Sequence, residues 1–437
     1  NFTTATDANN TAVGNNAGIA VTTGYSLTFV GAAAGASHLT GAQCTFIGSE
    51  SGNFATTSDN STFVGHEAGR GITGTKLTGN SNTAVGAFSG ANLQGAAADN
   101  TFLGKSAGGA ITTGSQNVLI GGIAGDALTN SNYNTAVGYS TLSTDTLGAR
   151  NTAVGHEALG SQNFTTATNS GNTAVGMAAG RLVTTGIENT LIGFQAGDDL
   201  EDSDRNTAVG AYALHTNTLG QYNTAVGYGS LNTANHATAT DAYNTAVGYS
   251  AGQSVTTGTN NTIVGATACL STTEGVNNTS LGYGGIRSCT TGDNNIGIGY
   301  GVGSNLFGQS IFHLTTEDDR IILGNSEHTN AYIQIDWTVT SDERDKTEIE
   351  DIAHGLSFVK QMRPISYKFN TSREDSTARG NTKYGFSAQD VLALEGDNPV
   401  IADNEDTDKL KITSAHLIPV LVKAIQELEA RIAVLEG

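Results

Sequence analysis

A five-residue pattern of two polar positions, two apolar positions and a glycine recurs along the first three hundred residues. Residues 134–138, Asn-Thr-Ala-Val-Gly, are one copy. Twelve of the sixteen intervals between the closing glycines are 17 residues long, three are 21 and one is 18. A fixed period of this size predicts a β-solenoid in which each repeat is one coil. The seventeen closing glycines are at positions 14, 31, 48, 65, 86, 104, 121, 138, 155, 176, 193, 210, 227, 248, 265, 282 and 299.

The apolar positions of the motif predict a strand that needs cover on both faces. The third position is Ala in eight copies and Phe in four, and the fourth is always Val, Ile or Leu, which predicts core. Adjacent strand residues point to opposite faces. One face must therefore be covered by the inside of its own coil, and the other must be covered by something outside the coil. We expect this outer cover to be another copy of the chain, that is, a homo-oligomer packed along the solenoid.

The polar positions and the glycine predict the corners of each coil. Asn fills the first position in fourteen copies and Thr the second in fifteen. Stacked Asn side chains can bond one another and satisfy the backbone of tight turns. The closing Gly allows a positive φ or a close approach of backbones. A second short segment such as 249–252 and a Thr-Thr-Gly turn such as 256–258 follow, which predicts two short strands and two turns per coil.

The pattern changes twice after Gly299. We expect a solenoid shaft over residues 1–305, a β-rich cap or neck over 306–340, because solenoid ends must be covered, and a further domain over 341–437. The aromatic residues Trp337, Tyr332 and Phe312 could form a glycan site in the cap, although core packing is the favoured alternative.

The last 97 residues are charged and have a mixed α/β pattern that ends in a helix. Alternating spacings of three and four predict a coiled-coil seam, and Ser414 is a candidate N-cap. Ile at a and Leu at d taken alone favour a parallel dimer. The seam consists of Ile418, Leu421, Ile425, Leu428, Ile432 and Leu435.

Composition and charge limit the kinds of partner that the chain is expected to bind. The chain has 437 residues with 57 Gly, 3 Pro and 14% charged residues, but its regularly spaced β-branched and aromatic residues indicate ordered β-structure rather than disorder. The net charge of -20 argues against nucleic acid and anionic membranes as partners, and no apolar run is long enough for membrane insertion. Residues 1–14 correspond to 163–176, so we expect the chain to begin inside a repeat, after a missing N-terminal region.

Cofactors, metals and the function of a calcium-binding β-roll are not expected. Cys44, Cys269 and Cys289 lack metal-site spacing and are interpreted as buried structural thiols. The repeat lacks the Gly- and Asp-rich nonapeptide of calcium-binding β-rolls. An ice-binding solenoid remains an alternative, although no flat Thr-x-Thr pattern recurs.

Two resemblances add to this pattern. Residues 1 to about 303 resemble the β-roll of trimeric adhesin heads, and also the shafts of phage tail fibres. Residues 341–346, Ser-Asp-Glu-Arg-Asp-Lys, followed by "LSFVKQMRPISYKFN", "YGFSAQDV" and "AIQELEARI", resemble the C-terminal intramolecular chaperone of phage tailspikes and tail fibres, a family that includes the endosialidase tailspikes.

The chaperone resemblance implies self-cleavage by a Ser/Lys pair. Ser341 would be the nucleophile and Lys346 its base, with cleavage between Thr340 and Ser341 and with Asp342 and Arg344 as supporting motif residues. Arg344 could also provide a cation that favours the neutral lysine. Asp345 departs from the apolar residue that often precedes this lysine, and its charge would favour the protonated amine.

Together these features predict a mainly β homotrimer: a phage tail-fibre or tail-tip protein whose chaperone sets the register of near-identical coils and then cuts itself off in a single turnover. The expected partners are a host surface receptor, either a glycan or an outer-surface protein, and other tail proteins contacted through the missing N-terminal region. The expected location is the virion tail, after assembly in the host cytoplasm. A secreted trimeric adhesin that uses the same chaperone is the alternative.

Overall fold

The computed structural model describes residues 7–304, 311–328, 330–334, 339–370, 373 and 375–436. It divides into two compact units. The first comprises residues 1–308 and 313–323, and the second comprises 309–312 and 324–437. Each unit is described by itself.

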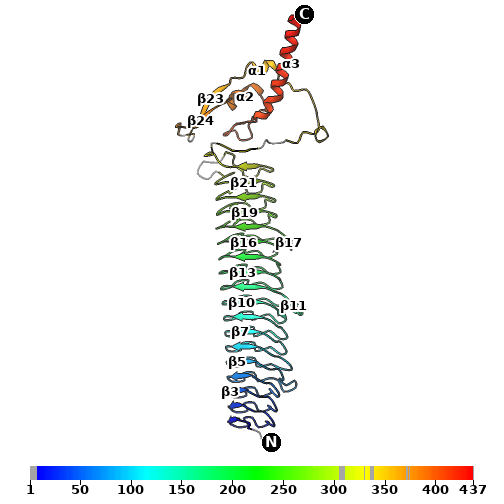
Figure 1. Ribbon diagram of the computed structural model, residues 1–437, viewed down its shortest axis with the longest axis vertical. Coiled ribbons are helices and arrows are strands. Elements are labelled where there is room, and N and C mark those ends of the chain that lie inside the picture. The colour runs from blue at the N-terminus through cyan, green and yellow to red at the C-terminus, as the bar shows by residue number, and fades with distance from the viewer. Residues whose placement is uncertain are drawn as a thin grey trace. The chain divides into compact units, whose positions relative to one another are not determined.

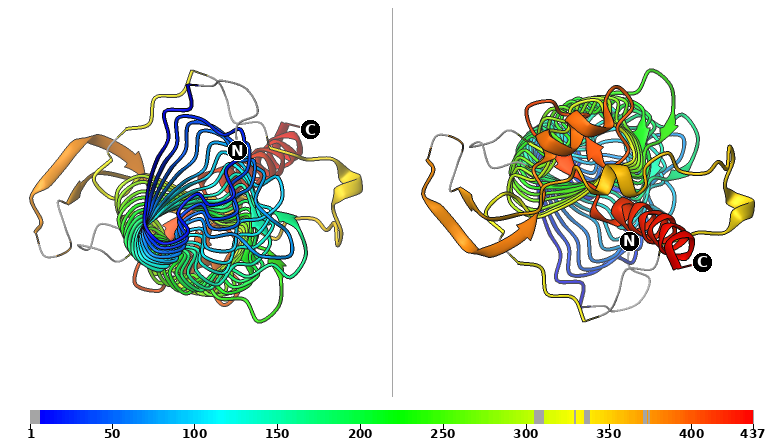
Figure 2. Two further views of the ribbon diagram at one scale, coloured as in Figure 1. Left: turned by 90° about the horizontal axis from the view of Figure 1, so that it is seen from below. Right: turned by 90° about the horizontal axis from the view of Figure 1, so that it is seen from above.

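The first unit is a β-solenoid built on one stack of parallel strands (Figure 1). Viewed along the stack, successive coils overlie one another (Figure 2). Eighteen three-residue strands form the stack, one from each coil. They are β1 (Thr11–Val13), β2 (Thr28–Val30), β3 (Thr45–Ile47), β4 (Thr62–Val64), β5 (Thr83–Val85), β6 (Thr101–Leu103), β7 (Val118–Ile120), β8 (Thr135–Val137), β10 (Thr152–Val154), β12 (Thr173–Val175), β13 (Thr190–Ile192), β14 (Thr207–Val209), β16 (Thr224–Val226), β18 (Thr245–Val247), β19 (Thr262–Val264), β20 (Thr279–Leu281), β21 (Ile296–Ile298) and β22 (Ile321–Leu323).

Every neighbouring pair of these strands keeps the motif in register. Thr135, Ala136 and Val137 lie beside Thr152, Ala153 and Val154, for example. The eighteenth strand, β22, comes from the segment expected to be the cap, and Ile296 pairs with Ile321. This copy breaks the period because an insertion separates it from β21 and Arg320 replaces the motif Asn.

The third motif position faces the inside of the coil and the fourth faces outward. Ala136 is buried, whereas its neighbour Val137 is partly exposed. The interpretation of the fourth position as core is therefore wrong for the single chain: Ile192 is 39% exposed and Leu281 is 48% exposed. The four phenylalanines at the third position are all buried. Strand alternation places the first and third positions on the same, inner side.

The predicted second strand of each coil is a turn instead. In the coil after β8, Ser140 and Leu142 have φ of 55° and 52°, and the closing Gly138 has φ of 143°. Alternating positive φ values curl the chain rather than extend it. In the described part of the solenoid, further strand pairs occur at two of the coils with four-residue insertions: β9 (Gly148–Ala149) with β11 (Thr168–Asn169), and β15 (Gly220–Gln221) with β17 (Thr240–Asp241).

The inner side chains compensate for one another in volume. Where the third position is Phe46, the residue four after the closing glycine is Gly52, whose added Cβ would lie 2.6 Å from the Phe46 ring. Where the third position is Ala136, the equivalent residue is the buried Leu142. In these two coils one large side chain fills the layer, as close packing requires.

The closing glycines form a column that no other residue fits. A Cβ added to Gly86 would lie 2.5 Å from the carbonyl oxygen of Gly104 in the next coil, and φ at Gly86 is 131°. This confirms the expectation of both a positive φ and a close backbone approach.

The second unit is a small α/β fold. Its hairpin pairs β23 (Ile365–Asn370) with β24 (Ala378–Gly385), and a second pair joins β25 (Ala402–Asp403) to β26 (Lys411–Ile412). The helices are η2 (Glu343–Asp345), α1 (Leu356–Val359), α2 (Ala388–Glu395), η3 (Ser414–His416) and α3 (Leu417–Glu436). Ser414 lies inside η3 and is not the N-cap of α3.

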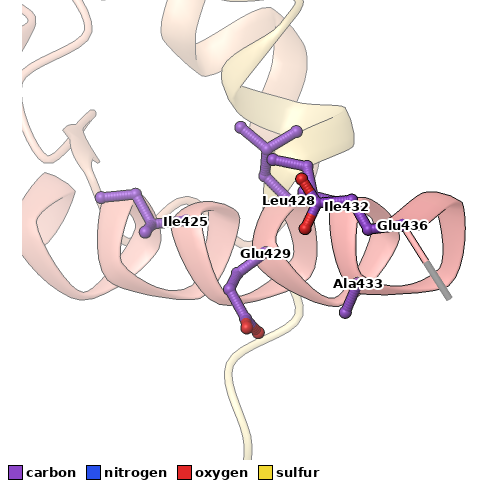
Figure 3. Close-up of a pocket in the computed structure, with 6 residues that line it drawn as sticks. All are labelled: Ile425, Leu428, Glu429, Ile432, Ala433 and Glu436. Carbon is purple, nitrogen blue, oxygen red and sulfur yellow. The ribbon is translucent and has the colours of Figure 1, made fainter.

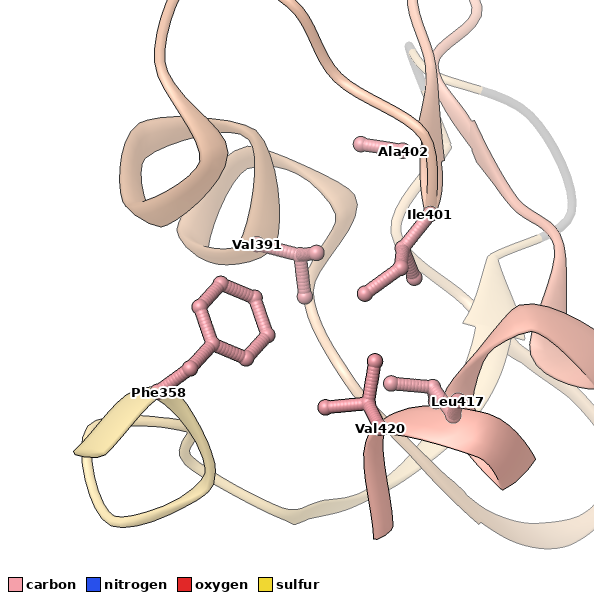
Figure 4. Close-up of a cluster of buried hydrophobic side chains, with 6 residues drawn as sticks. All are labelled: Phe358, Val391, Ile401, Ala402, Leu417 and Val420. Carbon is pink, nitrogen blue, oxygen red and sulfur yellow. The ribbon is translucent and has the colours of Figure 1, made fainter. Parts of the chain in front are cut away.

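One hydrophobic cluster holds this unit together (Figure 4). Its side chains come from α1, α2, the β25 region and the start of α3, and they converge on Val391. The Glu395 carboxylate also accepts the backbone N–H groups of Val400, Ile401 and Ala402 at 2.9, 2.7 and 2.7 Å. The cluster comprises Phe358, Val391, Ile401, Ala402, Leu417 and Val420.

Candidate functional site

A short helical turn positions the predicted Ser/Lys pair. Asp342 caps η2, because its Oδ1 accepts the backbone N–H of Arg344 at 2.9 Å. The backbone N–H of Lys346 then donates to the carbonyl oxygen of Glu343 at 3.1 Å and closes the turn. Five residues apart on a regular helix, two side chains would not share a face, and the turn brings them together instead.

The ammonium of Lys346 lies against Ser341. Lys346 Nζ donates to Ser341 Oγ at 2.9 Å and to the Ser341 carbonyl oxygen at 3.1 Å. A base within hydrogen-bond reach of a hydroxyl is the geometric requirement for nucleophilic activation. The pair is therefore placed for proton transfer from the serine.

Both residues of the pair and Thr340 are exposed in the single chain. A lysine works as a base only after it loses its proton, and burial or nearby cations lower a lysine pKa. The geometry of the pair is thus present, whereas the enclosure that such chemistry needs is not provided by the described part of this one chain.

Arg344 is committed to Asp342. Its Nε and a terminal nitrogen contact the Asp342 carboxylate at 3.0 and 2.6 Å, and this fork lowers the pKa of Asp342. The carboxylate compensates the guanidinium charge, so Arg344 supports the turn rather than supplying an unpaired cation. Among the described residues, Asp345 makes no hydrogen bond or ion pair through its carboxylate.

The three cysteines are structural, as expected. All are free and buried, and burial raises the pKa of Cys44 to about 11, of Cys269 to about 12 and of Cys289 to about 11. Thiolates are therefore scarce at neutral pH, which disfavours a cysteine nucleophile. Within the described ranges, no group of three or more His, Cys, Asp or Glu side chains could hold a metal ion.

The described aromatic residues that were considered for a glycan site differ in exposure. Phe312 is buried, with Lys411 Nζ lying 4.6 Å from its ring centroid. Tyr332 is almost fully exposed, and Trp337 lies outside the described residues. A buried ring offers no open stacking platform, so core packing is the better interpretation of Phe312.

Helix α3 has two apolar sides. Leu417 and Val420 belong to the hydrophobic cluster of the second unit, and Ala424 is also buried. The other side carries the predicted coiled-coil seam, which is exposed throughout and forms a shallow groove (Figure 3). The seam lies on the exposed side of the helix, and its pairing with other chains in a coiled coil stays a prediction. The groove is lined by Ile425, Leu428, Glu429, Ile432, Ala433 and Glu436.

Sequence reasoning missed the contact that links α1 to α3. The Glu427 carboxylate of α3 accepts the backbone N–H of Leu356 at 2.8 Å, at the start of α1. An acidic group at a helix N-terminus is favourable, but a separation of 71 residues gives no local signal.

Residues 341–398 match the family model of the chaperone of endosialidase. The match begins at Ser341 and includes Lys346, the hairpin and α2. It implies trimer formation through an intramolecular chaperone. No curated protein matches the chain. In the described part of the chain, no helix combines the length and apolar character needed to cross a membrane.

Proposed function

We propose that this chain is a homotrimeric fibre protein of a bacteriophage tail, with a β-solenoid shaft and a C-terminal chaperone that cuts itself off before Ser341. The observation that carries the proposal is the contact of Lys346 Nζ with Ser341 Oγ at 2.9 Å, at the residue where the chaperone match begins.

The cleavage step uses the two side chains in sequence. Neutral Lys346 takes the hydroxyl proton of Ser341, and Ser341 Oγ attacks the carbonyl carbon of Thr340. The bond between that carbon and the Ser341 nitrogen breaks, the nitrogen takes up a proton, and an ester joins Thr340 to Ser341 Oγ. Water hydrolyses the ester, which leaves a Thr340 carboxylate and a free amine on Ser341.

Trimerisation supplies the enclosure that the single chain lacks. The Ser341–Lys346 turn is exposed in one copy, and so is the seam of α3. Packing of three chaperone units would exclude water from such a turn and favour the neutral lysine. Cutting would then follow assembly rather than precede it.

The shaft explains why a chaperone is needed. Each coil pairs with the next through the same motif, so two copies displaced by one coil would still match most of their contacts. A trimer started at the C-terminus begins in register. Once the chaperone has been removed, the assembled chains cannot return to the unassembled state by the path along which they formed, and the rod is kinetically stable.

The match to the chaperone of endosialidase supports a proposal for the biological setting. The fibre would attach a virion to a host surface receptor, either a glycan or an outer-surface protein, and would join other tail proteins. It would be assembled in the host cytoplasm and would function in the virion tail. A secreted trimeric adhesin is the second candidate, supported by the likeness of the motif to adhesin β-rolls.

The experiment that tests the proposed function compares two routes to a shaft without a chaperone. A gene truncated after residue 340 is expected to give aggregated or misregistered shaft, whereas the full gene is expected to give soluble trimers that stay intact after cleavage. Soluble, heat-resistant trimers from the truncated gene would show that residues 341–437 are not a chaperone.

A further inference from the structure

The outward side of the strand stack is an uncharged stripe along the whole shaft. We call the residues at the second and fourth motif positions, from Thr11 and Val13 in β1 to Ile321 and Leu323 in β22, the outer strand face. In the eighteen strands these positions hold only Thr, Val, Ile and Leu. A chain with a net charge of -20 thus keeps this face free of ionisable groups.

The outer strand face is open in the single chain. Ile192 is 39% exposed and Leu103 is 47% exposed, although the coils above and below each of them already cover part of their surface. Contiguous exposed apolar surface of this extent marks an interaction site. Parallel strands that are apolar on both faces are normally covered on both.

The other sides of the coils are less suited to contact between copies because they carry the charges. Arg205 bonds Glu188 at 2.7 Å on one turn column, and Arg181 bonds Asp198 at 2.9 Å on another. Burying such groups against another copy costs desolvation free energy. The Thr and aliphatic columns carry no such cost.

We infer that the three copies of the shaft meet through the outer strand face, turned toward a common axis. This rests on the proposed trimer and names the surface that holds it together. The occupant is a second copy because its face has the same rung spacing and the same length, so every coil finds an equivalent coil. It also adds no charge to an uncharged surface.

A neighbouring aromatic column does not offer an equally good alternative. Tyr228 and Tyr249 stack with ring centroids 5.5 Å apart and an interplanar angle of 10°, and Tyr283 and Tyr300 stack at 5.5 Å and 12°. Rings stacked along the column cover one another's faces. The faces between stacked rings are therefore not open as flat platforms for sugar rings.

Disulfide trapping in the full-length chain tests this inference. The three native cysteines are buried, so a single added cysteine reports on its own position. Val226→Cys places a thiol on the outer strand face, and Ala237→Cys places one on an exposed loop of the same coil. Under mild oxidation, Val226→Cys is expected to pair two chains of each trimer covalently and leave the third free, and Ala237→Cys is expected to leave all chains separate.

Native mass distinguishes the ways in which the inference could fail. One contradicting result is a particle of three chains in which the Val226→Cys thiol reacts freely with a maleimide. This result would support the trimer but overturn the proposed interface, because the outer strand face would be open to another ligand. Pairing through Ala237→Cys alone would also overturn it. A single-chain particle would overturn both this interface and the proposed function.

Charge placement provides a second test that does not depend on oxidation. Val226→Lys combined with Val247→Lys puts two charges on the outer strand face, and Ala237→Lys combined with Ala239→Lys adds the same charge to the loop. The first pair is expected to lower the melting temperature of the assembled shaft while the circular dichroism of its coils is retained. Equal behaviour of the two pairs would contradict the inference.

Discussion

Asn134 Oδ1 accepts the backbone N–H of Asn151 in the next coil at 3.0 Å, and Asn134 Nδ2 donates to the carbonyl oxygen of Gly148 at 3.0 Å. One side chain thereby satisfies a strand amide and a corner carbonyl of the following coil. The bond to the next motif Asn recurs along the column, as from Asn261 to Asn278 at 2.9 Å. The expected role of the motif asparagine is confirmed.

Asn134→Ala is expected to lower the free energy of unfolding of the shaft by about 2–4 kcal/mol, because it leaves a buried N–H and a buried carbonyl without partners. Chemical denaturation measures the change. Asn130→Ala, at an exposed position that accepts only threonine hydroxyl groups, is the matched control and is expected to change little. Equal effects of the two substitutions would show that the Asn column is not a major source of stability.

His38 makes the stability of the shaft depend on pH. It is buried between Phe29 and Phe46, with its ring nitrogens 3.0 Å from the carbonyl oxygens of Ala55 and Gly41. Burial lowers the pKa of His38 below 6.5. The unfolded chain therefore binds this proton more readily than the folded chain does, so the stabilising contribution is present above pH 6.5 and falls as the pH drops below it.

The substitution His38→Asn is expected to reduce this loss of stability in acid. Asn217 occupies the equivalent position of another coil and contacts the carbonyl oxygen of Gly220 in the same way, at 2.7 Å. Denaturation midpoints at pH 7 and pH 5 give the comparison, with the exposed His156→Asn as control. An unchanged acid response in His38→Asn would assign the pH dependence to other groups.

Ser341→Ala and Lys346→Ala are each expected to abolish self-cleavage, because one removes the attacking oxygen and the other removes the base. Both variants should still form trimers, since neither side chain belongs to the hydrophobic cluster of the second unit. Intact-mass measurement after expression detects the cut. A fragment that begins at residue 341 in the Ser341→Ala variant would show that another group cleaves the chain.

If the wild-type chain remains uncut, we expect the charge of Asp345 to be the cause. Its negative charge favours the protonated form of a nearby amine, so Asp345→Leu is expected to restore cutting in that case. Asp345→Asn is the matched variant that keeps the size of the side chain and removes only the charge. Failure of both would contradict an inhibitory role for Asp345.

Periodicity was sufficient to predict the solenoid but not which side of its strand faces inward. Alternation predicts that Ala136 and Val137 point to opposite faces, but it does not predict which of the two points into the coil. In two coils, compensation in volume identifies the inner position: Phe46 occurs with Gly52, and Ala136 occurs with Leu142, as expected for side chains that share one enclosed layer.

The turn chemistry was the weaker part of the sequence interpretation. The segment after each closing glycine holds apolar residues at strand-like spacing, yet Leu142 and Leu159 have φ of 52° and 50°. Such φ values are unfavourable for leucine, and burial of each side chain inside the coil compensates for them. No local propensity predicts this, because the stabilisation comes from neighbouring coils.

The residues of the candidate site could be predicted from the sequence, but the surroundings of these residues could not. The motif named Ser341 and Lys346, and the structure brings their side chains together at 2.9 Å. The partner of Arg344 was unexpected, because Asp342 lies only two residues away and accepts both its backbone and side-chain N–H groups. In the proposed trimer, other copies of the chain would enclose the pair, and the spacing of residues in one sequence gives no information on such contacts.

The native mass of the particle formed by the full-length chain tests the central claim most directly. Sedimentation equilibrium of the purified product is expected to give three shafts per particle, whether or not the chaperone units have been released, because the uncharged outer strand face and the exposed α3 seam both lack cover in one copy. A soluble particle of one chain that remains folded would contradict the account.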